Sequence, residues 1–305
     1  MSLYDTIIVG AGPAGMTAAI YAIRANLKVL MLDRLSPGGQ MLNTNEIENY
    51  TGVGSINGAE LAIQMFTHTQ ELGIEYDERT VIGLETTGDL IKVVCEEDNA
   101  VYETKTVIVA TGSLPRTLGV PGEEMFKSNG ISWCAICDGP QYRDKDVVVI
   151  GGGNSAVEES IYLAGFVKSL TIITLFDLTA DPVACDRLRA FENVKIHPYQ
   201  EILEFKGNGK LEGVRFKSTK TDEEQSVSCD GVFEYIGLQP MTKIVESFNI
   251  CNEFGTIRVD QDMQTAVKGI YAAGDVIDKH LRQIVTACAD GAIAAQKASK
   301  YIETL

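Results

Sequence analysis

The sequence YDTIIVGAGPAG at positions 4–15 is the strongest indication of the fold of this chain, and DVVVIGGGNSAV at positions 146–157 repeats its pattern. In both stretches a short run of mostly β-branched residues leads into closely spaced glycines, and a helix-forming stretch follows. An apolar run without polar alternation is typical of a parallel strand that is buried on both faces. A strand, a glycine-rich turn and a helix in this order form the start of a dinucleotide-binding unit. The chain therefore contains two candidate units of this kind.

The spacing of these two units predicts the domain organisation. The chain has 305 residues, which is more than one hydrophobic core usually organises. We predict an α/β protein with two Rossmann-like, three-layer ββα dinucleotide-binding domains, the second inserted in the first. Residues 1–116 and 245–305 would form the first domain, and residues 117–244 would form the second.

The composition is that of an ordinary globular protein, with 45% hydrophobic and 22% charged residues. The formal net charge of −16 repels phosphate backbones and anionic lipid, so we expect no nucleic acid and no membrane partner. The N-terminal residues run directly into a strand pattern without a secretory signal, and no apolar stretch reaches the length of about 18 residues that a membrane span needs. The expected location is cytoplasmic.

The first glycine motif has the context of a nucleotide site. Gly10 suits a tight turn, Gly12 a close approach of the backbone to a pyrophosphate, and Gly15 close packing of helix on strand. The acidic residue at the end of the next strand, 21 positions after Gly12, is placed to accept hydrogen bonds from ribose hydroxyls. An ordinary helix–strand turn with a chance acid is the alternative. The candidate nucleotide-binding residues of this motif are Gly10, Gly12, Pro13, Ala14, Gly15 and Asp33.

The segment 133–139, WCAICDG, is the most informative one for chemistry. Its two cysteines, Cys134 and Cys137, could form a redox disulfide, half of a zinc site, or two inert thiols. A zinc site needs two more ligands, and the other cysteines and the histidines are scattered, so we predict no metal. Two spacer residues bring the sulfurs within bonding reach, and Asp138 could deliver a proton to a departing thiolate.

Taken together, these motifs resemble the low-molecular-weight thioredoxin reductases. Shared segments also occur at 37–40 (PGGQ), 48–50 (ENY), 110–112 (ATG), 274–275 (GD) and 282–283 (RQ), in the family's order. The resemblance implies that the first site holds FAD. The further FAD residues that it implies are Gly39, Gln40, Asn49, Val81, Ala110, Thr111, Gly112, Gly274, Asp275, Arg282, Gln283 and Ile284.

The resemblance also implies how the dithiol works. Cys137 would be the thiol that faces the flavin, Cys134 would attack the disulfide of a partner, and Asp138 would act as general acid. The implied partner is thioredoxin or a similar small redox protein, and the implied assembly is a homodimer.

The second glycine motif keeps a pyrophosphate site but departs from the family beyond it. Its candidate residues for NADH or NADPH are Gly151, Gly153, Asn154, Ser155, Ala156 and Asp177. NADPH-linked relatives carry a His-Arg-Arg-x-x-x-Arg signature where this chain reads TLFDLTA at 174–180. A 2′-phosphate without a bidentate cation would bind poorly, and Asp177 would repel it, so we favour NADH. Relaxed NADPH binding and a protein donor such as ferredoxin remain open.

Three functions are compatible with these residues. The first is a flavin-dependent disulfide reductase acting on thioredoxin or a similar redox protein, and the second is a flavoprotein that reduces a peroxiredoxin. The third is a non-catalytic redox sensor, which needs no proton donor such as Asp138 beside its thiols. We predict the first, a thioredoxin-disulfide reductase-like FAD oxidoreductase.

Overall fold

The computed structural model describes residues 3–44 and 47–305, and its contacts divide the chain into two compact units. Unit 1 comprises Met1–Leu114 and Gln239–Leu305, and unit 2 comprises Pro115–Leu238. Unit 2 is thus inserted in unit 1, and the borders expected from the sequence, after residues 116 and 244, lie a short way along the chain from these. The first two residues of the expected first domain lie outside the described residues.

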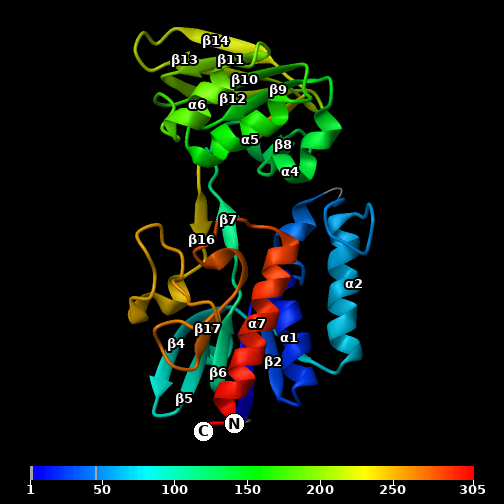
Figure 1. Ribbon diagram of the computed structural model, residues 1–305, viewed down its shortest axis with the longest axis vertical. Helices are drawn as coiled ribbons and strands as arrows, with labels where there is room; N and C mark the ends of the chain where they lie inside the picture. The colour runs from blue at the N-terminus through cyan, green and yellow to red at the C-terminus, as the bar shows by residue number, and fades with distance from the viewer. Residues whose placement is uncertain (1–2, 45–46) are drawn as a thin grey trace. The chain divides into compact units, whose positions relative to one another are not determined.

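Unit 1 is built on a seven-stranded sheet, shown in the lower part of Figure 1. Its order is β3-β2-β1-β6-β5-β4, and β17 also pairs with β6. The strands are β1 (Leu3–Val9), β2 (Val29–Asp33), β3 (Glu75–Glu78), β4 (Val81–Thr87), β5 (Leu90–Cys95), β6 (Val101–Val109) and β17 (Ile270–Ala272). The helices are α1 (Pro13–Arg24), α2 (Gly58–Glu71) and α7 (Ile284–Ile302), with 3-10 turns η1 (Gly39–Asn43), η2 (Glu97–Asn99), η4 (Lys243–Phe248) and η5 (Gly274–Val276).

Strand β1 explains why the first apolar run has no polar alternation. Successive side chains of a strand point to opposite faces of the sheet. Ile8 enters the core beneath α1, α2 and α7, whereas Ile7 and Val9 enter a second core shared with β4, β5 and η4. Both faces of the sheet are therefore covered, which gives the three layers that the sequence predicted.

Unit 2 repeats this plan with a five-stranded parallel sheet in the order β11-β10-β9-β15-β8 and a three-stranded antiparallel sheet, β12-β13-β14. The strands are β8 (Ile131–Ser132), β9 (Asp146–Ile150), β10 (Ser169–Thr174), β11 (Val194–Pro198), β12 (Gln200–Gly207), β13 (Leu211–Ser218), β14 (Glu224–Ser228) and β15 (Gly231–Glu234). The helices are α3 (Glu123–Phe126), α4 (Ala135–Asp138), α5 (Asn154–Ala164) and α6 (Pro182–Arg189), with a 3-10 turn η3 (Gly139–Tyr142). Two short strands, β7 (Ser113–Pro115) and β16 (Leu238–Pro240), pair where the chain passes between the units.

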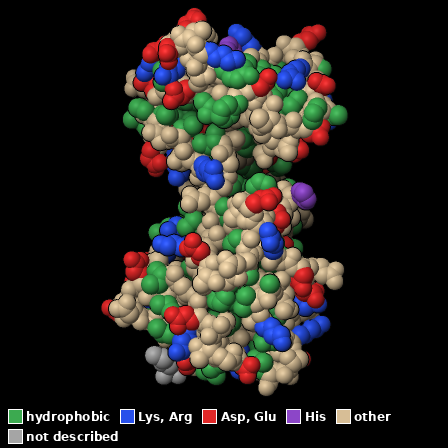
Figure 2. Space-filling model, turned by 90° about the vertical axis from the view of Figure 1, so that its left-hand side faces the viewer, with side chains coloured by type: hydrophobic (Ala, Val, Ile, Leu, Met, Phe, Trp, Pro, Cys, Tyr) green, Lys and Arg blue, Asp and Glu red, His purple; other side chains and the backbone are tan. Residues whose placement is uncertain are grey.

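The surface carries charges of both signs. On the face drawn in Figure 2, Lys and Arg side chains are interspersed with Asp and Glu. Within residues 3–44 and 47–305, no helix has both the length and the apolar character needed to cross a membrane.

Candidate functional site

The first glycine motif forms the turn between β1 and α1 in unit 1. Gly10 has φ +114°, and a Cβ there would lie 2.2 Å from the carbonyl oxygen of Ala110. A Cβ on Gly15 would lie 1.8 Å from the oxygen of Gly10, so neither position accepts a larger residue. A Cβ on Gly12 would meet no atom within 4 Å. Packing thus demands the two outer glycines, while Gly12 borders open space at the start of α1, next to Pro13 and Ala14.

Asp33, at the end of β2, is tied to this turn. Its Oδ2 accepts a hydrogen bond from the backbone N–H of Ala11 at 2.6 Å, and its Oδ1 accepts one from Leu35 at 3.2 Å. Each carboxylate oxygen has a second lone pair that can accept a further hydrogen bond. The N–H of Arg79 donates to the Asp33 carbonyl, which brings the chain just before Val81 and β4 beside the same strand end.

Gly38 and Gly39 lie against the glycine turn, and the N–H of Gly38 donates to the Ala11 carbonyl. A Cβ on Gly39 would lie 3.4 Å from the Cα of Gly12. Gln40 is exposed, and its Oε1 accepts a long hydrogen bond from Asn43. The Asn49 amide donates to Oε1 of Gln283 at 3.0 Å, which joins two candidate residues that are 234 positions apart.

The loop at 110–112 is anchored from the later half of unit 1. Ala110 donates from its N–H to the Val9 carbonyl. The Thr111 hydroxyl donates to the carbonyl of Met241 at 2.7 Å, and Met241 in turn donates to Gly112.

The segment at 274–284 has two buried polar atoms without a partner. Gly274 packs so closely on α1 that a Cβ there would lie 2.9 Å from the Cβ of Ala14. Among the described residues, Oδ1 of Asp275 and Nε of Arg282 are buried and make no hydrogen bond. Burial raises the pKa of Asp275, and Lys279 and Arg282 act against this rise. A buried polar atom without a partner costs free energy unless a ligand satisfies it.

Ile284 begins α7 directly after the capping residue Gln283.

Two charged residues that the sequence did not single out complete this segment. Lys279 and Asp290 form an ion pair at 2.5 Å whose side chains are 12% and 13% exposed. Oδ2 of Asp290 also accepts a hydrogen bond from the N–H of Gly274 at 3.1 Å. In the sequence, Asp290 stands out only as a single acid in the run of small residues ACADGAIAA at 287–295. No known spacing of residues connects it with Gly274.

In unit 2, Cys134 and Cys137 are joined by a disulfide with a Cα–Cα distance of 5.3 Å. Cys134 is the N-terminal cap of the one-turn helix α4, and its Sγ accepts a hydrogen bond from the N–H of Cys137 at 3.2 Å. Both cysteines are partly exposed. In the reduced form, an N–H directed at the Cys134 sulfur favours the thiolate, which is the nucleophilic form.

Asp138 closes the same turn. Its N–H donates to the Cys134 carbonyl at 3.0 Å, and its Oδ2 accepts a hydrogen bond from the hydroxyl of Ser132 at 2.5 Å. Burial raises the pKa of Asp138, and the Ser132 hydrogen bond partly opposes this rise. A raised pKa makes a carboxyl group a better proton donor near neutral pH. Ser132 was not predicted, because nothing in the sequence marks a serine two residues before a cysteine.

The side chains of Glu159 and Tyr235 both accept a hydrogen bond from the backbone of the turn that carries Cys134 and Cys137. The N–H of Ala135 donates to the Tyr235 hydroxyl at 2.8 Å and to Oε2 of Glu159 at 3.0 Å. The Tyr235 hydroxyl donates to that same Glu159 oxygen at 3.0 Å. Burial raises the pKa of Glu159, and its hydrogen bonds act against this rise.

The second glycine motif has the geometry of the first. A Cβ on Gly151 would lie 2.3 Å from the carbonyl oxygen of Tyr235, and a Cβ on Gly153 would meet no atom within 4 Å. Ala156 is buried, and Ser155, at the start of α5, is exposed. Oδ1 of Asn154 accepts a hydrogen bond from the N–H of Asp181 at 2.9 Å, which ties the turn to the loop after β10.

Asp177 lies in that loop and is exposed. Its Oδ1 accepts a hydrogen bond from the N–H of Leu178 at 2.7 Å and lies 3.8 Å from Nη2 of Arg189. Thr174, where the first motif would place an acid, is buried, whereas Leu175 and Phe176 are exposed.

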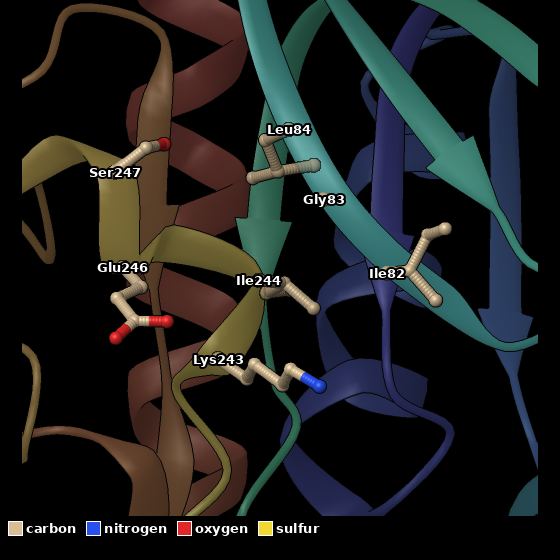
Figure 3. Close-up of a pocket in the computed structure, with 7 residues that line it drawn as sticks. All are labelled: Ile82, Gly83, Leu84, Lys243, Ile244, Glu246 and Ser247. Atoms are coloured by element: carbon tan, nitrogen blue, oxygen red, sulfur yellow. The ribbon is translucent and has the colours of Figure 1, made fainter.

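Unit 1 also has a hollow of about 390 Å³ between β4 and η4, shown in Figure 3. Its lining residues are Ile82, Gly83, Leu84, Lys243, Ile244, Glu246 and Ser247. Neither glycine motif nor either redox cysteine contributes to it. In the described part of the chain, no group of three or more His, Cys, Asp or Glu residues is arranged to hold a metal ion.

Comparison with known proteins agrees with this arrangement. The sequence pattern of the family described as pyridine nucleotide-disulphide oxidoreductase matches residues 4–291. The thioredoxin reductase of Bacillus subtilis (strain 168) is 46% identical over 312 residues, which cover 99% of this chain and 96% of that protein.

Solved structures show the same relationship. The crystal structure of thioredoxin reductase from Streptococcus pyogenes MGAS5005 has a TM-score of 0.93 at 44% identity, covering 99% of both chains. A ferredoxin-flavin thioredoxin reductase from Clostridium acetobutylicum has a TM-score of 0.56 at 27% identity, covering 100% of this chain and 99% of that one. The chain therefore belongs to the thioredoxin reductase family of pyridine nucleotide-disulphide oxidoreductases.

Proposed function

We propose that this protein is a flavin-dependent disulfide reductase that passes electrons through FAD and the Cys134–Cys137 pair to thioredoxin or a similar small redox protein. The observation that carries the proposal is the helical turn formed by residues 134–138, which we call the redox turn. A partly exposed disulfide, an N–H directed at Cys134 and a half-buried Asp138 with a raised pKa occur together in one helical turn of a thioredoxin reductase relative.

FAD fits the residues of unit 1. The open space beside Gly12 and the N-terminus of α1 suit a pyrophosphate. Asp33 and the backbone at Val81 suit the adenosine half, and Asn49 with Gln283 the flavin half. The unpartnered atoms of Asp275 and Arg282 would gain partners from the ribityl and phosphate groups. Bound FAD would supply the two-electron exchange between a nicotinamide donor and a disulfide.

The dithiol form of the redox turn would carry out the second half of the reaction. The Cys134 thiolate attacks a sulfur of the partner disulfide, and the departing partner thiolate takes a proton, for which Asp138 is the source. The Cys137 thiolate then attacks the Cys134 sulfur of the mixed disulfide. This step restores the Cys134–Cys137 disulfide and releases the second partner thiol, so two electrons pass to the partner.

The residues around the second glycine motif favour NADH over NADPH. The open position at Gly153 accommodates a pyrophosphate, and Asp177 is the acid available for a ribose hydroxyl. The loop places exposed Leu175 and Phe176 where the family's arginines would stand. Loss of two charge-assisted contacts, each about 1.5–3 kcal/mol, lowers the affinity for a 2′-phosphate by roughly 10²–10⁴-fold.

A protein donor is the second candidate. Two Clostridium acetobutylicum structures named ferredoxin-flavin thioredoxin reductases match 100% and 99% of this chain. The glycine turn at 151–153 is nevertheless intact here, which supports a nucleotide donor. The resemblance to the family further supports a homodimer and a cytoplasmic location, and light scattering of the purified protein tests the former.

Anaerobic stopped-flow reduction of the FAD-loaded protein tests the donor. We expect fast loss of flavin absorbance with NADH and slow loss with NADPH. Asp177→Asn should slow the reaction with NADH, whereas the control Asp186→Asn, which removes another exposed acid paired with Arg189, should not. Fast reduction by NADPH refutes the specificity proposed for this loop, and no reduction by either nucleotide favours ferredoxin.

A further inference from the structure

Glu234, the last residue of strand β15, and the next residue, Tyr235, contact the chain on either side of Cys134. Phe233 and Tyr235 belong to the core beneath α5, whereas Val232 and Ile236 belong to the opposite core. Glu234 falls on the second of these faces because side chains alternate along a strand. Tyr235 holds the backbone just after Cys134, as described above. Glu234 contacts the residue just before it.

Glu234 is buried, with 2% of its surface exposed, and its Oε2 accepts a hydrogen bond from Nε1 of Trp133 at 3.1 Å. Its Oε1 is buried, and within the described residues no donor reaches it. The carboxyl group of Glu123 is the neighbouring acid whose charge and hydrogen bonding act on Glu234. An ionised Glu234 would therefore leave one oxygen unsatisfied beside a second acid.

Glu123, on α3, has a different environment. Its Oε1 accepts a hydrogen bond from the N–H of Leu118 at 2.8 Å, and its Oε2 accepts one from Gly119 at 2.6 Å and one from Val120 at 3.3 Å. Three backbone N–H groups already donate to the Glu123 carboxylate, whereas no donor within the described residues reaches Oε1 of Glu234. A proton on Glu234 removes this deficit, because a neutral carboxyl group can donate a hydrogen bond to the neighbouring Glu123.

We propose that Glu234, as a neutral carboxylic acid, is a positioning residue for the redox turn: it bridges Glu123 and the Trp133 indole and thereby holds the segment that carries Cys134. Every polar atom of the bridge then has a partner. The Trp133 ring is fixed at one end by Glu234, and its backbone leads directly from β8 into Cys134.

The charges that act on this bridge are few. Burial, followed by the charge of Glu123 and its hydrogen bond, raises the pKa of Glu234 to about 8. The ammonium group of Lys127 lies 5.9 Å from the centre of the Trp133 ring. Glu159 acts on Tyr235, on the other face of the strand. Ionisation of Glu234 at alkaline pH would place two carboxylates side by side and loosen the bridge.

The first test uses the fluorescence of Trp133, which is the only tryptophan in the chain. The FAD-loaded protein is kept in the disulfide form, so that neither redox cysteine titrates, and its tryptophan emission is recorded from about pH 6 to about pH 10. We expect one transition near the pKa of Glu234, absent in Glu234→Gln and retained in the control Lys127→Met. A transition that persists in Glu234→Gln, or no transition in the unmodified protein, overturns the proposal.

The second test measures the rate at which the reduced dithiol attacks a small aromatic disulfide in single turnover. Glutamine can accept from Trp133 and donate to Glu123, so Glu234→Gln should keep the rate at neutral pH and extend it to alkaline pH. Glu234→Leu should lower the rate roughly two- to ten-fold, the range of one ordinary hydrogen bond. Trp133→Phe should lower it as much, with no further loss in the double variant.

Equal losses in the glutamine and leucine variants, or none in leucine, would refute the positioning role. If Glu234→Leu does not fold, the comparison of Glu234→Gln with Trp133→Phe decides the same question. The kinetic readout rests on the redox role proposed for Cys134, whereas the fluorescence readout does not. A protein that shows the pH-dependent change in Trp133 fluorescence but does not reduce disulfides would therefore contradict the proposed function. It would still support the contact of Glu234 with Glu123 and Trp133.

Discussion

Removal of the Asp290 charge should destabilise the protein strongly, because its partner Lys279 has little exposure to solvent. Asp290→Asn keeps the shape of the side chain and an oxygen that accepts the N–H of Gly274, but it removes the negative charge. Lys279 is then left without its partner at a site where its side chain is only 12% exposed. Removal of one member of a buried pair costs about 3–5 kcal/mol.

A second ion pair in the same unit provides the control. Lys297 and Asp262 lie 2.6 Å apart, almost the same distance, but their side chains are 32% and 38% exposed. Exposed pairs contribute about 0–1 kcal/mol because water screens them and solvates the charge that remains. Asp262→Asn should therefore cost at most about 1 kcal/mol. The two variants change the same chemical group and differ mainly in burial.

Calorimetry and far-UV circular dichroism of the four proteins test this reasoning. In a unit of this size, 1 kcal/mol corresponds to about 2–4 °C in Tm, so Asp290→Asn should melt roughly 6–20 °C lower and Asp262→Asn at most a few degrees lower. The double variant Lys279→Met with Asp290→Asn should recover part of the loss, because no unpaired charge remains buried. Equal effects of Asp290→Asn and Asp262→Asn would refute the assignment of a buried, coupled pair.

Three further outcomes follow from the same structure. Asp138→Asn removes the proton donor of the redox turn and should slow disulfide reduction by about 10²–10⁴-fold while flavin reduction by the nucleotide stays unchanged; if both half-reactions slow equally, Asp138 is not the acid. Because the pKa of Glu234 is raised from its ordinary value of 4.5 to about 8, the stability it contributes should be present below pH 4.5 and lost as the pH rises through about 8. Thermal melts of Glu234→Gln and the unmodified protein across that range should therefore shift relative to each other in favour of glutamine, and parallel curves would contradict the raised pKa. Gly15→Ala places a Cβ 1.8 Å from the oxygen of Gly10 and should abolish FAD retention, whereas Gly83→Ala, which meets no atom within 4 Å, should leave the flavin content of the purified protein unchanged.

Much of the fold followed from local pattern. The two apolar runs before the glycine motifs predicted buried parallel strands, and β1 and β9 are such strands. The family was also readable from the order of its motifs along the chain, and the relatives confirm it. Backbone geometry explains this success: a strand buried on both faces and a turn with no room for Cβ atoms restrict residue type at fixed spacings.

The hydrogen bonds that hold the redox turn and the Gly274 segment in place could not be predicted from local sequence pattern. Ser132 and Tyr235 contact the redox turn, but they come from different parts of the chain and follow no motif. Asp290 meets Gly274 only because α7 packs against α1 and the η5 turn.

The two nucleotide units, the redox cysteines and the family thus follow from local sequence pattern. Which acids are buried together follows from tertiary contacts alone. Glu123 and Glu234 are separated by 111 positions and look like ordinary surface acids in the sequence. The raised pKa of Glu234 depends on its burial and on its neighbours, and folding alone creates those surroundings.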